Sequence, residues 1–456
     1  MVQARVHRCL EVLSILAGPD RLSIMGLRLA RALALSALFA APPALALQPL
    51  EVFVAAAGQH NPDALESEAN LNLAAAQSDL ALGRVLPGVA ARASYTRNQY
   101  DSVVDFTAFG GGVVTIVPLH QQDVVLSLTV PLIDLAGFDR VRAARSSARA
   151  ASDQRAATAL QIQGLVAQDY YQLVANLALV TASAKALEVS RENLRLAQNR
   201  YDAGVVPELD VDRARAEVEQ QNQQVATAGL QVALAARALE SASGVAPDAA
   251  TTVPLDDDLH PEAALQGFEA GIEQLPAVSA ATESTRAAEQ QADAQKLTLV
   301  PTLSGSITER YTSAPGFTGH DWAWQGLLAL NWAFDYTTFA NMKVQSAAAG
   351  AAHSRELRVR LAARDAIHRQ WETVSASIAR SRSARAGRAA AAHAADSARD
   401  RYQAGAITQL ELLQAQRDAF SAEVSRIQAD ADLVNARAQL RLATGTSLLK
   451  SPGTVQ

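Results

Sequence analysis

The feature that most constrains the fold is that the 456-residue sequence consists of two related halves. The segment RYDAG at 200–204 recurs as RYQAG at 401–405, an offset of 201 residues. The same offset relates three further pairs: Asp134 and Asp335, Tyr170 and Trp371, Gly244 and Gly445. Further upstream the offset is 214, since Pro62 and Pro87 correspond to Pro276 and Pro301. The repeat predicts one structural unit used twice, with a loop 13 residues longer in the first half.

Each half is predicted to contain the same elements in the same order. A first helix covers 50–85 or 274–299 and ends before a proline. Two strands follow, at 89–98 and 124–131 in the first half and at 302–311 and 322–334 in the second. Two long helices complete each half, at 138–201 and 208–244, then at 339–402 and 409–445.

The strand expected at 322–334 has the clearest pattern. Its even positions place Trp322, Trp324, Trp332 and Phe334 on one face, with aromatic residues near both ends. This arrangement is typical of the aromatic girdles of a membrane β-barrel, where the tryptophans would face lipid. A half-buried hairpin of a soluble protein accounts for the strand pattern alone equally well.

The helices after each strand pair are unusually long. No proline occurs between Pro131 and Pro207, and residues 138–201 would span roughly 95 Å as one helix at 1.5 Å per residue. Seven-residue spacing follows each RYxAG segment: Val211, Val218, Val225, Val232 and Leu239, then Leu413, Phe420, Ile427 and Val434. Such helices form coiled-coil seams and cannot fold back into one compact core, so the fold class is mainly α, a tube or bundle with a small β part.

The N-terminal residues 1–46 have the pattern of a signal peptide. Arg28 and Arg31 precede an apolar run at 32–41, and Ala44-Leu45-Ala46 provides a cleavage site after two prolines. Met25 is the natural start of this segment, although a buried N-terminal helix is the alternative interpretation. The chain's only cysteine, Cys9, lies in this segment, so the mature protein would have neither disulfides nor a catalytic thiol.

Composition and motifs exclude several classes of function. The net charge is −6 and no basic run occurs, which argues against nucleic-acid binding. No sequence motif of a hydrolase, nucleotide-binding protein or zinc enzyme is present, so we expect no enzyme activity, no cofactor and no metal. After residue 46 no run of 18 apolar residues occurs, so we expect no transmembrane helix. An exported chain of this kind is periplasmic, secreted or a β-barrel.

The strand count predicts an oligomer if the strands enter a membrane. Four strands cannot close a barrel, and an open edge is not tolerated in lipid. Two chains would give an eight-stranded barrel, and side chains would just fill its interior. Three chains would give twelve strands around a lumen. A homotrimer is therefore expected from the requirement for a conduit.

The order of elements resembles the TolC family of outer-membrane efflux proteins. Asn61-Pro62, Leu86-Pro87 and the two RYxAG segments carry the resemblance, which covers nearly the whole mature chain. It implies a homotrimer with a twelve-stranded barrel in outer-membrane lipid and a twelve-helix tunnel in the periplasm. It also implies two partners, a periplasmic adaptor protein and an inner-membrane transporter, in efflux or secretion.

The resemblance also suggests a constriction where the tunnel ends. By position, Asp210 and Tyr402 match a pair that links neighbouring helices, and Glu411 matches a ring of acids. The sequence departs from the family at Gln414, where a second acid is expected, and at Ile407, where an arginine link is expected.

Replacement links and a simpler explanation both exist for these turns. Arg213 and Arg417 are candidates for the missing link. Gly204 and Gly405 follow helices and are expected to adopt the left-handed conformation that ends a helix. The acids would then simply favour the positive ends of the helices that follow.

The sequence thus predicts a trimeric outer-membrane exit duct. Its expected divisions are a signal peptide at 1–46, a first repeat at 47–244, a linker at 245–273, a second repeat at 274–445 and a tail at 446–456. The alternatives are a soluble periplasmic coiled-coil adaptor or chaperone and, less well supported by the motifs, an exported enzyme.

Overall fold

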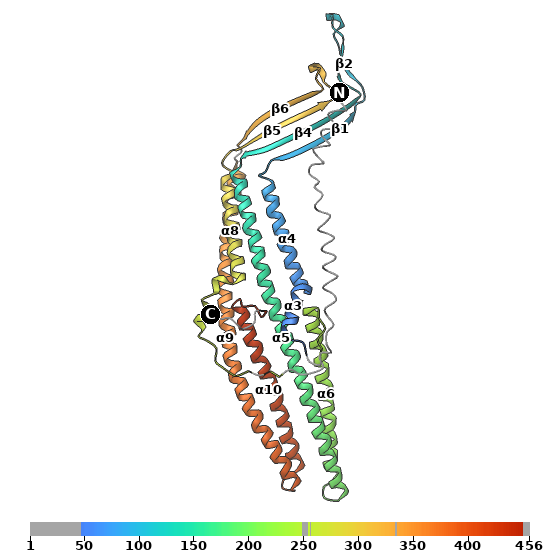
Figure 1. The fold of residues 1–456 in the computed structure, drawn as a ribbon, viewed down its shortest axis with the longest axis vertical. Coiled ribbons are helices and arrows are strands. Elements are labelled where there is room, and N and C mark those ends of the chain that lie inside the picture. Colours follow the sequence, from blue (N-terminus) through green and yellow to red (C-terminus); the bar gives the residue numbers. More distant parts are fainter. Residues whose placement is uncertain (1–46, 249–253, 256, 333–334, 450–456) are drawn as a thin grey trace, which may run out of the picture.

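The computed structural model describes residues 47–248, 254–255, 257–332 and 335–449. The expected signal peptide, Phe334 and the last residues of the tail lie outside this range. The chain is elongated, with a β-sheet at one end and the turns of two helical hairpins at the other (Figure 1). The α-helices are α3 Leu50–His60, α4 Pro62–Gly83, α5 Leu135–Asp202, α6 Glu208–Ser243, α7 Leu265–Glu269, α8 Pro276–Leu297, α9 Tyr336–Gln403 and α10 Gln409–Ala443. The strands are β1 Gly88–Arg97, β2 Ser102–Asp105, β3 Val113–Val117, β4 His120–Ile133, β5 Thr302–Thr312 and β6 Trp322–Asn331.

The main sheet is antiparallel throughout, in the order β1-β4-β5-β6. Each half of the chain contributes one hairpin, β1 with β4 and β5 with β6, and the two hairpins pair through β4 and β5. The strands contain 10 to 14 residues, the length that spans a bilayer when strands are tilted. Consequently β1 and β6 are left as unpaired edges in the single chain.

A second, two-stranded sheet explains why the halves differ in length. Between β1 and β4 lie 22 residues, whereas only nine separate β5 from β6. The longer connection forms the β2–β3 hairpin, which extends beyond the main sheet (Figure 1). The repeat predicts only a longer loop for the 13-residue difference, and these two short strands are an additional feature of the structure.

The helix expected at 50–85 is divided into two. Asn61 has an extended backbone, with φ −67° and ψ 130°, because the residue before a proline avoids the helical conformation. Its side chain accepts a hydrogen bond from the Asp63 backbone N–H at 2.9 Å and thereby caps α4. Its amide also donates to the Ala242 carbonyl at 2.9 Å, which ties the break to the end of α6.

The two longest helices begin at equivalent aspartates. Asp134 caps α5 by accepting from the Gly137 backbone N–H at 2.7 Å. Asp335 caps α9 in the same way and forms a capping box with Thr338. The repeat therefore reproduces both the position and the chemistry of this strand-to-helix junction.

The helices form a curved layer rather than a compact bundle. Near the sheet, α4 packs on α5, α5 on α8 and α8 on α9. Near the turns, α6 packs on α5, α5 on α10 and α10 on α9. The order near the sheet matches the strand order, so the edge helices α4 and α9 continue the edge strands.

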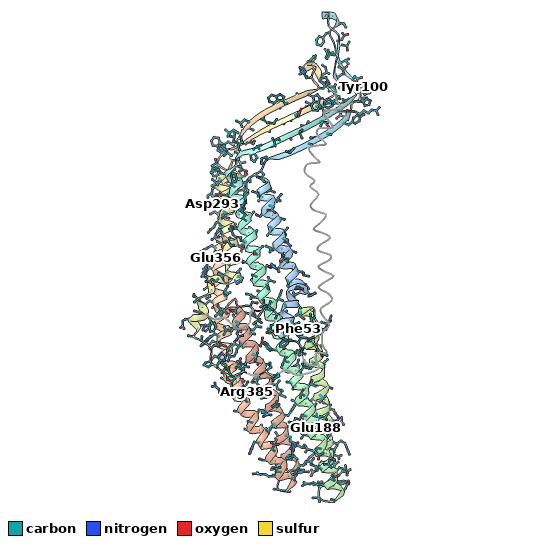
Figure 2. All side chains as sticks on the ribbon, in the orientation of Figure 1. Phe53, Tyr100, Glu188, Asp293, Glu356 and Arg385 are labelled. Atoms are coloured by element: carbon teal, nitrogen blue, oxygen red, sulfur yellow. The ribbon has the colours of Figure 1, made fainter. Side chains whose placement is uncertain are left out.

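The largest buried cluster lies midway along the molecule, around Phe53 (Figure 2). Phe53, Leu173 and Leu239 are fully buried where α3, α5 and α6 meet, and each such side chain contributes about 1.5–3 kcal/mol. Burial also raises the pKa of Tyr170, which contacts Phe53, to about 12.

An 18-residue stretch of α5 has a mean hydropathy of 1.3, enough by length and composition to cross a membrane. This helix differs from the expectation that no segment after residue 46 is apolar enough to cross a membrane. In the single chain 39% of this stretch is buried, and α5 contributes Val166 and Leu173 to the core around Phe53, so packing between helices accounts for part of its apolar character.

Candidate functional site

The main sheet has one apolar and one polar face. Directly paired residues in antiparallel strands point to the same side, so the register assigns every side chain to a face. One face carries mainly apolar residues: Val89, Ala91, Ala93, Val124, Leu126, Leu128, Leu303, Ile307, Trp322, Trp324, Leu328 and Leu330. The opposite face carries mainly small and polar residues: Ser94, Thr96, Ser127, Thr129, Ser304, Ser306, Thr308, Gln325 and Asn331.

The predicted tryptophans lie at the ends of this apolar face. Trp322 contacts Tyr311, with ring centroids 5.1 Å apart, and is 63% exposed. Trp324 is 78% exposed on the same face. Trp332 follows the other end of β6, and its indole N–H donates to the Leu299 carbonyl at 3.1 Å. Large apolar side chains that lie exposed on one sheet face need an apolar medium, which lipid provides.

The opposite end of the molecule contains two equivalent turns, at Gly204 and Gly405. Their φ angles are +73° and +74°, which favours glycine. Gly204 and Val205 donate backbone hydrogen bonds to Tyr201 and Arg200, and the second turn repeats both bonds. These paired bonds form the Schellman motif that ends each long helix, as the sequence predicted.

The predicted linking pair is not joined within the described chain. Asp210 lies in the first turn of α6, 3.5 Å from Arg213 of the same helix. Tyr402 is 4% exposed, and its hydroxyl has no hydrogen-bond partner among the described residues. Arg200 instead contacts Tyr402: its guanidinium lies 4.4 Å from the ring centroid and donates to the Tyr402 carbonyl at 2.8 Å.

Glu411 caps its own helix. Its carboxylate accepts from the Thr408 backbone N–H at 2.7 Å and from the Thr408 hydroxyl at 2.9 Å. The backbone bond, and then the hydroxyl bond, lower the pKa of Glu411 below its usual range. Gln414 is exposed and donates to Asp418 at 3.0 Å, again within α10. These contacts provide the helix-start role considered for the acids.

Side chains of Asn193, Arg200 and Arg417 join the two hairpins above the turns. Arg417 donates from Nε to Glu217 at 2.8 Å. Arg417 therefore links two helices, as one of the candidates for the missing link. Asn193 donates to Gln416 at 2.6 Å, and Arg200 reaches the end of α9 as described. The Asn193 and Arg200 contacts were not predicted, because they depend on how α5 packs against the second hairpin.

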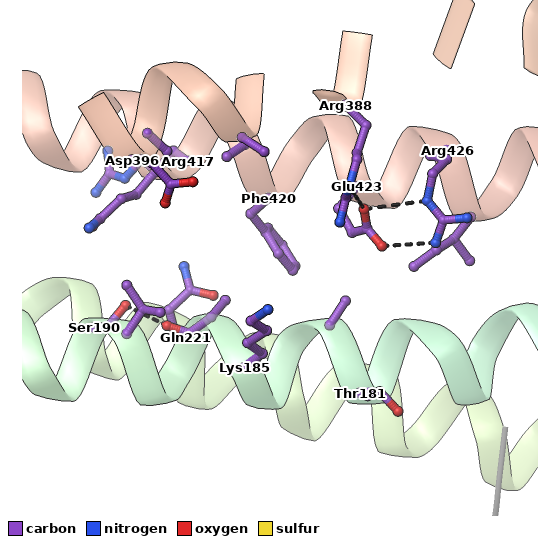
Figure 3. Close-up of a pocket in the computed structure, with 18 of the residues that line it drawn as sticks. Thr181, Lys185, Ser190, Gln221, Arg388, Asp396, Arg417, Phe420, Glu423 and Arg426 are labelled. Atoms are coloured by element: carbon purple, nitrogen blue, oxygen red, sulfur yellow. Dashed lines mark hydrogen bonds and ion pairs between the residues drawn. The ribbon is translucent and has the colours of Figure 1, made fainter. Parts of the chain in front are cut away.

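A cavity of about 590 Å³ lies between the two hairpins (Figure 3). Lys185, Gln221 and Phe420 line it together with alanines and several ion pairs, among them Arg388 with Glu423 at 2.9 Å. These side chains form an open, charged groove and present no arrangement of nucleophile and base.

One cluster in the linker has the residue types of a metal site. Ligand atoms of Asp257, Asp258 and His260 lie within 4.8 Å of one another. However, Arg437 contacts this cluster, with Nε 2.8 Å from Asp257 and Nη1 3.1 Å from His260 Nε2. The buried Arg437 guanidinium is therefore the cationic partner of Asp257, and this contact fastens the linker to α10.

The sequence matches the family model described as "Outer membrane efflux protein" over residues 54–245 and 269–446. No curated protein matches the chain. Among solved structures, CusC is similar with a TM-score of 0.76 and 16% identity, covering 87% of this chain and 92% of that one. CmeC of Campylobacter jejuni has a TM-score of 0.73 and 19% identity, covering 88% and 86%. VceC of Vibrio cholerae has a TM-score of 0.73 and 20% identity, covering 87% and 96%.

Family membership therefore decides against the soluble adaptor or chaperone considered above. Membership of this family agrees with the two ends of the molecule: a sheet with an apolar face that suits the membrane, and long helices that suit the periplasm. The chain belongs to the outer membrane efflux protein family, the TolC family expected from its sequence, whose members are channels of the outer membrane.

Proposed function

We propose that three copies of this chain close into one exit duct that works with a periplasmic adaptor and an inner-membrane transporter. The main supporting observation is the four-stranded sheet, which has an apolar face and two open edges, β1 and β6. Joining β1 of one copy to β6 of the next removes every edge. Twelve strands leave a lumen lined by the polar face.

The helical layer supports the same assembly. Its edge helices carry large apolar side chains that are exposed in the single chain: Leu65, Leu73 and Leu80 on α4, and Val344, Leu357 and Leu361 on α9. Each of these is 50–60% exposed. Because α4 and α9 continue the edges of the sheet, one ring closure would cover both stripes.

The turns of the hairpins are the proposed docking site for the adaptor. Val205, Leu209 and Leu410 are 69%, 56% and 57% exposed there, at the end farthest from the sheet. Leu209 and Leu410 are equivalent in the repeat, so three copies would present six similar apolar positions. Exposed apolar clusters of this kind typically mark protein interfaces.

The mass of the detergent-extracted protein tests the assembly. We expect a membrane fraction that resists carbonate extraction and a particle containing three chains. A monomer released by osmotic shock would refute the proposal. A photo-crosslinking residue at Val205 should capture the adaptor, whereas the same residue at the exposed Leu73, predicted to lie between subunits, should capture only another copy.

A further inference from the structure

Two arginines lie at one level of the polar sheet face. Arg92 of β1 pairs with Val125 of β4, which pairs with Arg310 of β5, which in turn pairs with Ala323 of β6. Directly paired side chains point to the same side, so Arg92 and Arg310 both belong to the polar face.

Only part of this positive charge is neutralised. Arg310 donates to Asp123 at 3.0 Å, and Asp123 lies two residues from Val125 on the same face. Arg92 is exposed and makes no ion pair with any described residue. These three residues are the only charged ones on the polar face of the four strands, which leaves one positive charge per chain.

We propose that these arginines form a belt around the outer part of the duct that selects for anions and for substrates carrying an anionic group. The belt rests on the proposed homotrimer, in which six arginines and three aspartates would lie near one level, with a net charge of +3. Low-dielectric walls concentrate such a field on the lumen. A guanidinium also binds carboxylates and phosphates in a bidentate manner, which favours these groups over a simple halide.

The belt contrasts with the far end of the molecule. The turns there carry charges of their own, the acids Asp210 and Glu411 and the arginines Arg200 and Arg213. Total conductance would therefore combine the effects of both ends. A local measurement of potential is needed in the barrel, and paired cysteine reporters provide it.

The matched reporters are Ala90→Cys and Ala91→Cys in the full chain with Cys9→Ser. Ala90 lies on the polar face two residues from Arg92, and its neighbour Ala91 lies on the apolar face. Both are exposed in the single chain, so only the assembly should distinguish them. The purified trimer is treated with the anionic sulfonatoethyl methanethiosulfonate or the cationic trimethylammonioethyl methanethiosulfonate. The rate at which each reagent modifies the cysteine is divided by its rate with a small free thiol.

We expect residue 90 to react and residue 91 to be protected. The anionic reagent should react faster at residue 90, and a potential of about one kT per unit charge would change the rate ratio about sevenfold. Arg92→Gln should reduce the ratio at least threefold, whereas Arg92→Lys should preserve it. Arg310→Gln should also reduce it, because Asp123 loses its partner.

Two outcomes would overturn the proposal for different reasons. If residue 90 reacts and 91 is protected, but the ratio is near one and insensitive to Arg92→Gln, the duct stands and the belt is refuted. If both reporters react equally, or residue 90 does not react, the assignment of faces and the proposed trimer fail together with the belt.

Discussion

The ion pair between Glu217 and Arg417 gives the sharpest test of how the two hairpins are held together. It joins α6 to α10, and the Glu217 carboxylate is 5% exposed, whereas the Arg417 side chain is 47% exposed. Gln221 donates to the other Glu217 oxygen at 2.8 Å. Removing Arg417 would therefore leave a buried carboxylate with one neutral donor.

The expected cost lies between those of surface and buried pairs. Exposed ion pairs contribute about 0–1 kcal/mol, and breaking a buried pair costs about 3–5 kcal/mol. For a buried acid and a half-exposed base we expect about 1.5–2.5 kcal/mol, close to a hydrogen bond with a charged group. This value corresponds to a roughly 10- to 70-fold change in the equilibrium between joined and separated hairpins.

Planar-bilayer recordings of Arg417→Ala should thus show a larger open fraction than the parent. The double variant Arg417→Ala with Glu217→Gln should have a smaller open fraction than Arg417→Ala alone, because it no longer buries an uncompensated carboxylate. Arg213→Ala is the matched control, because Arg213 pairs with Asp210 on its own helix and joins no hairpins. An open fraction that is unchanged in Arg417→Ala, or equally raised by Arg213→Ala, would refute the reasoning.

Three further predictions follow from the two ends of the molecule. Trp324→Asp should weaken trimer formation on semi-native gels, because it places a charge on the lipid face, at a cost below the about 2–4 kcal/mol of a basic residue at the bilayer midplane, whereas Gln325→Asp should assemble normally. Gly405→Ala should lower the melting temperature, since a left-handed residue with a Cβ costs about 1–2 kcal/mol, whereas Gly229→Ala within a helix should raise it. Glu411→Gln should speed amide exchange at the start of α10 at neutral pH but not in acid, once the Glu411 carboxylate of the folded parent is protonated. The lowered pKa of Glu411 means that its stabilisation is present above the unfolded pKa and is lost as pH falls through the folded one.

Local chemistry explains why much of the fold could be predicted from sequence. Alternation identified the main strands because one sheet face is apolar along its length. The RYxAG segments identified both turns because a Schellman ending requires a residue with positive φ, which Gly204 and Gly405 supply. The break at Asn61 could also have been predicted, since Pro62 restricts the residue before it.

The contacts of the candidate site were harder to predict from the sequence, because they join residues on different helices. The resemblance to the family suggested a link between Asp210 and Tyr402, yet the structure gives Asp210 a partner on its own helix. Nothing in the local sequence pattern distinguishes Glu217 from the acids nearest to it in α6. Those acids are exposed, whereas Glu217 is buried. Its burial follows from how α6 approaches α10, which no single-helix periodicity contains.

The repeat itself nevertheless contained a signal for these contacts. Helices α6 and α10 are equivalent and both run away from the turns, so equivalent residues lie at similar heights. Contacts between the halves should then join residues about 201 positions apart. Two of the links described above fit this rule: Glu217 with Arg417, 200 positions apart, and Arg200 with Tyr402, 202 apart. The link between Asn193 and Gln416 does not, since its residues are 223 positions apart. A search of the duplicated helices for opposite charges within one residue of the repeat length would have found the Glu217–Arg417 pair, which lie 200 positions apart. A search at the repeat length of 201 alone would have missed it, because the residue 201 positions after Glu217 is Asp418.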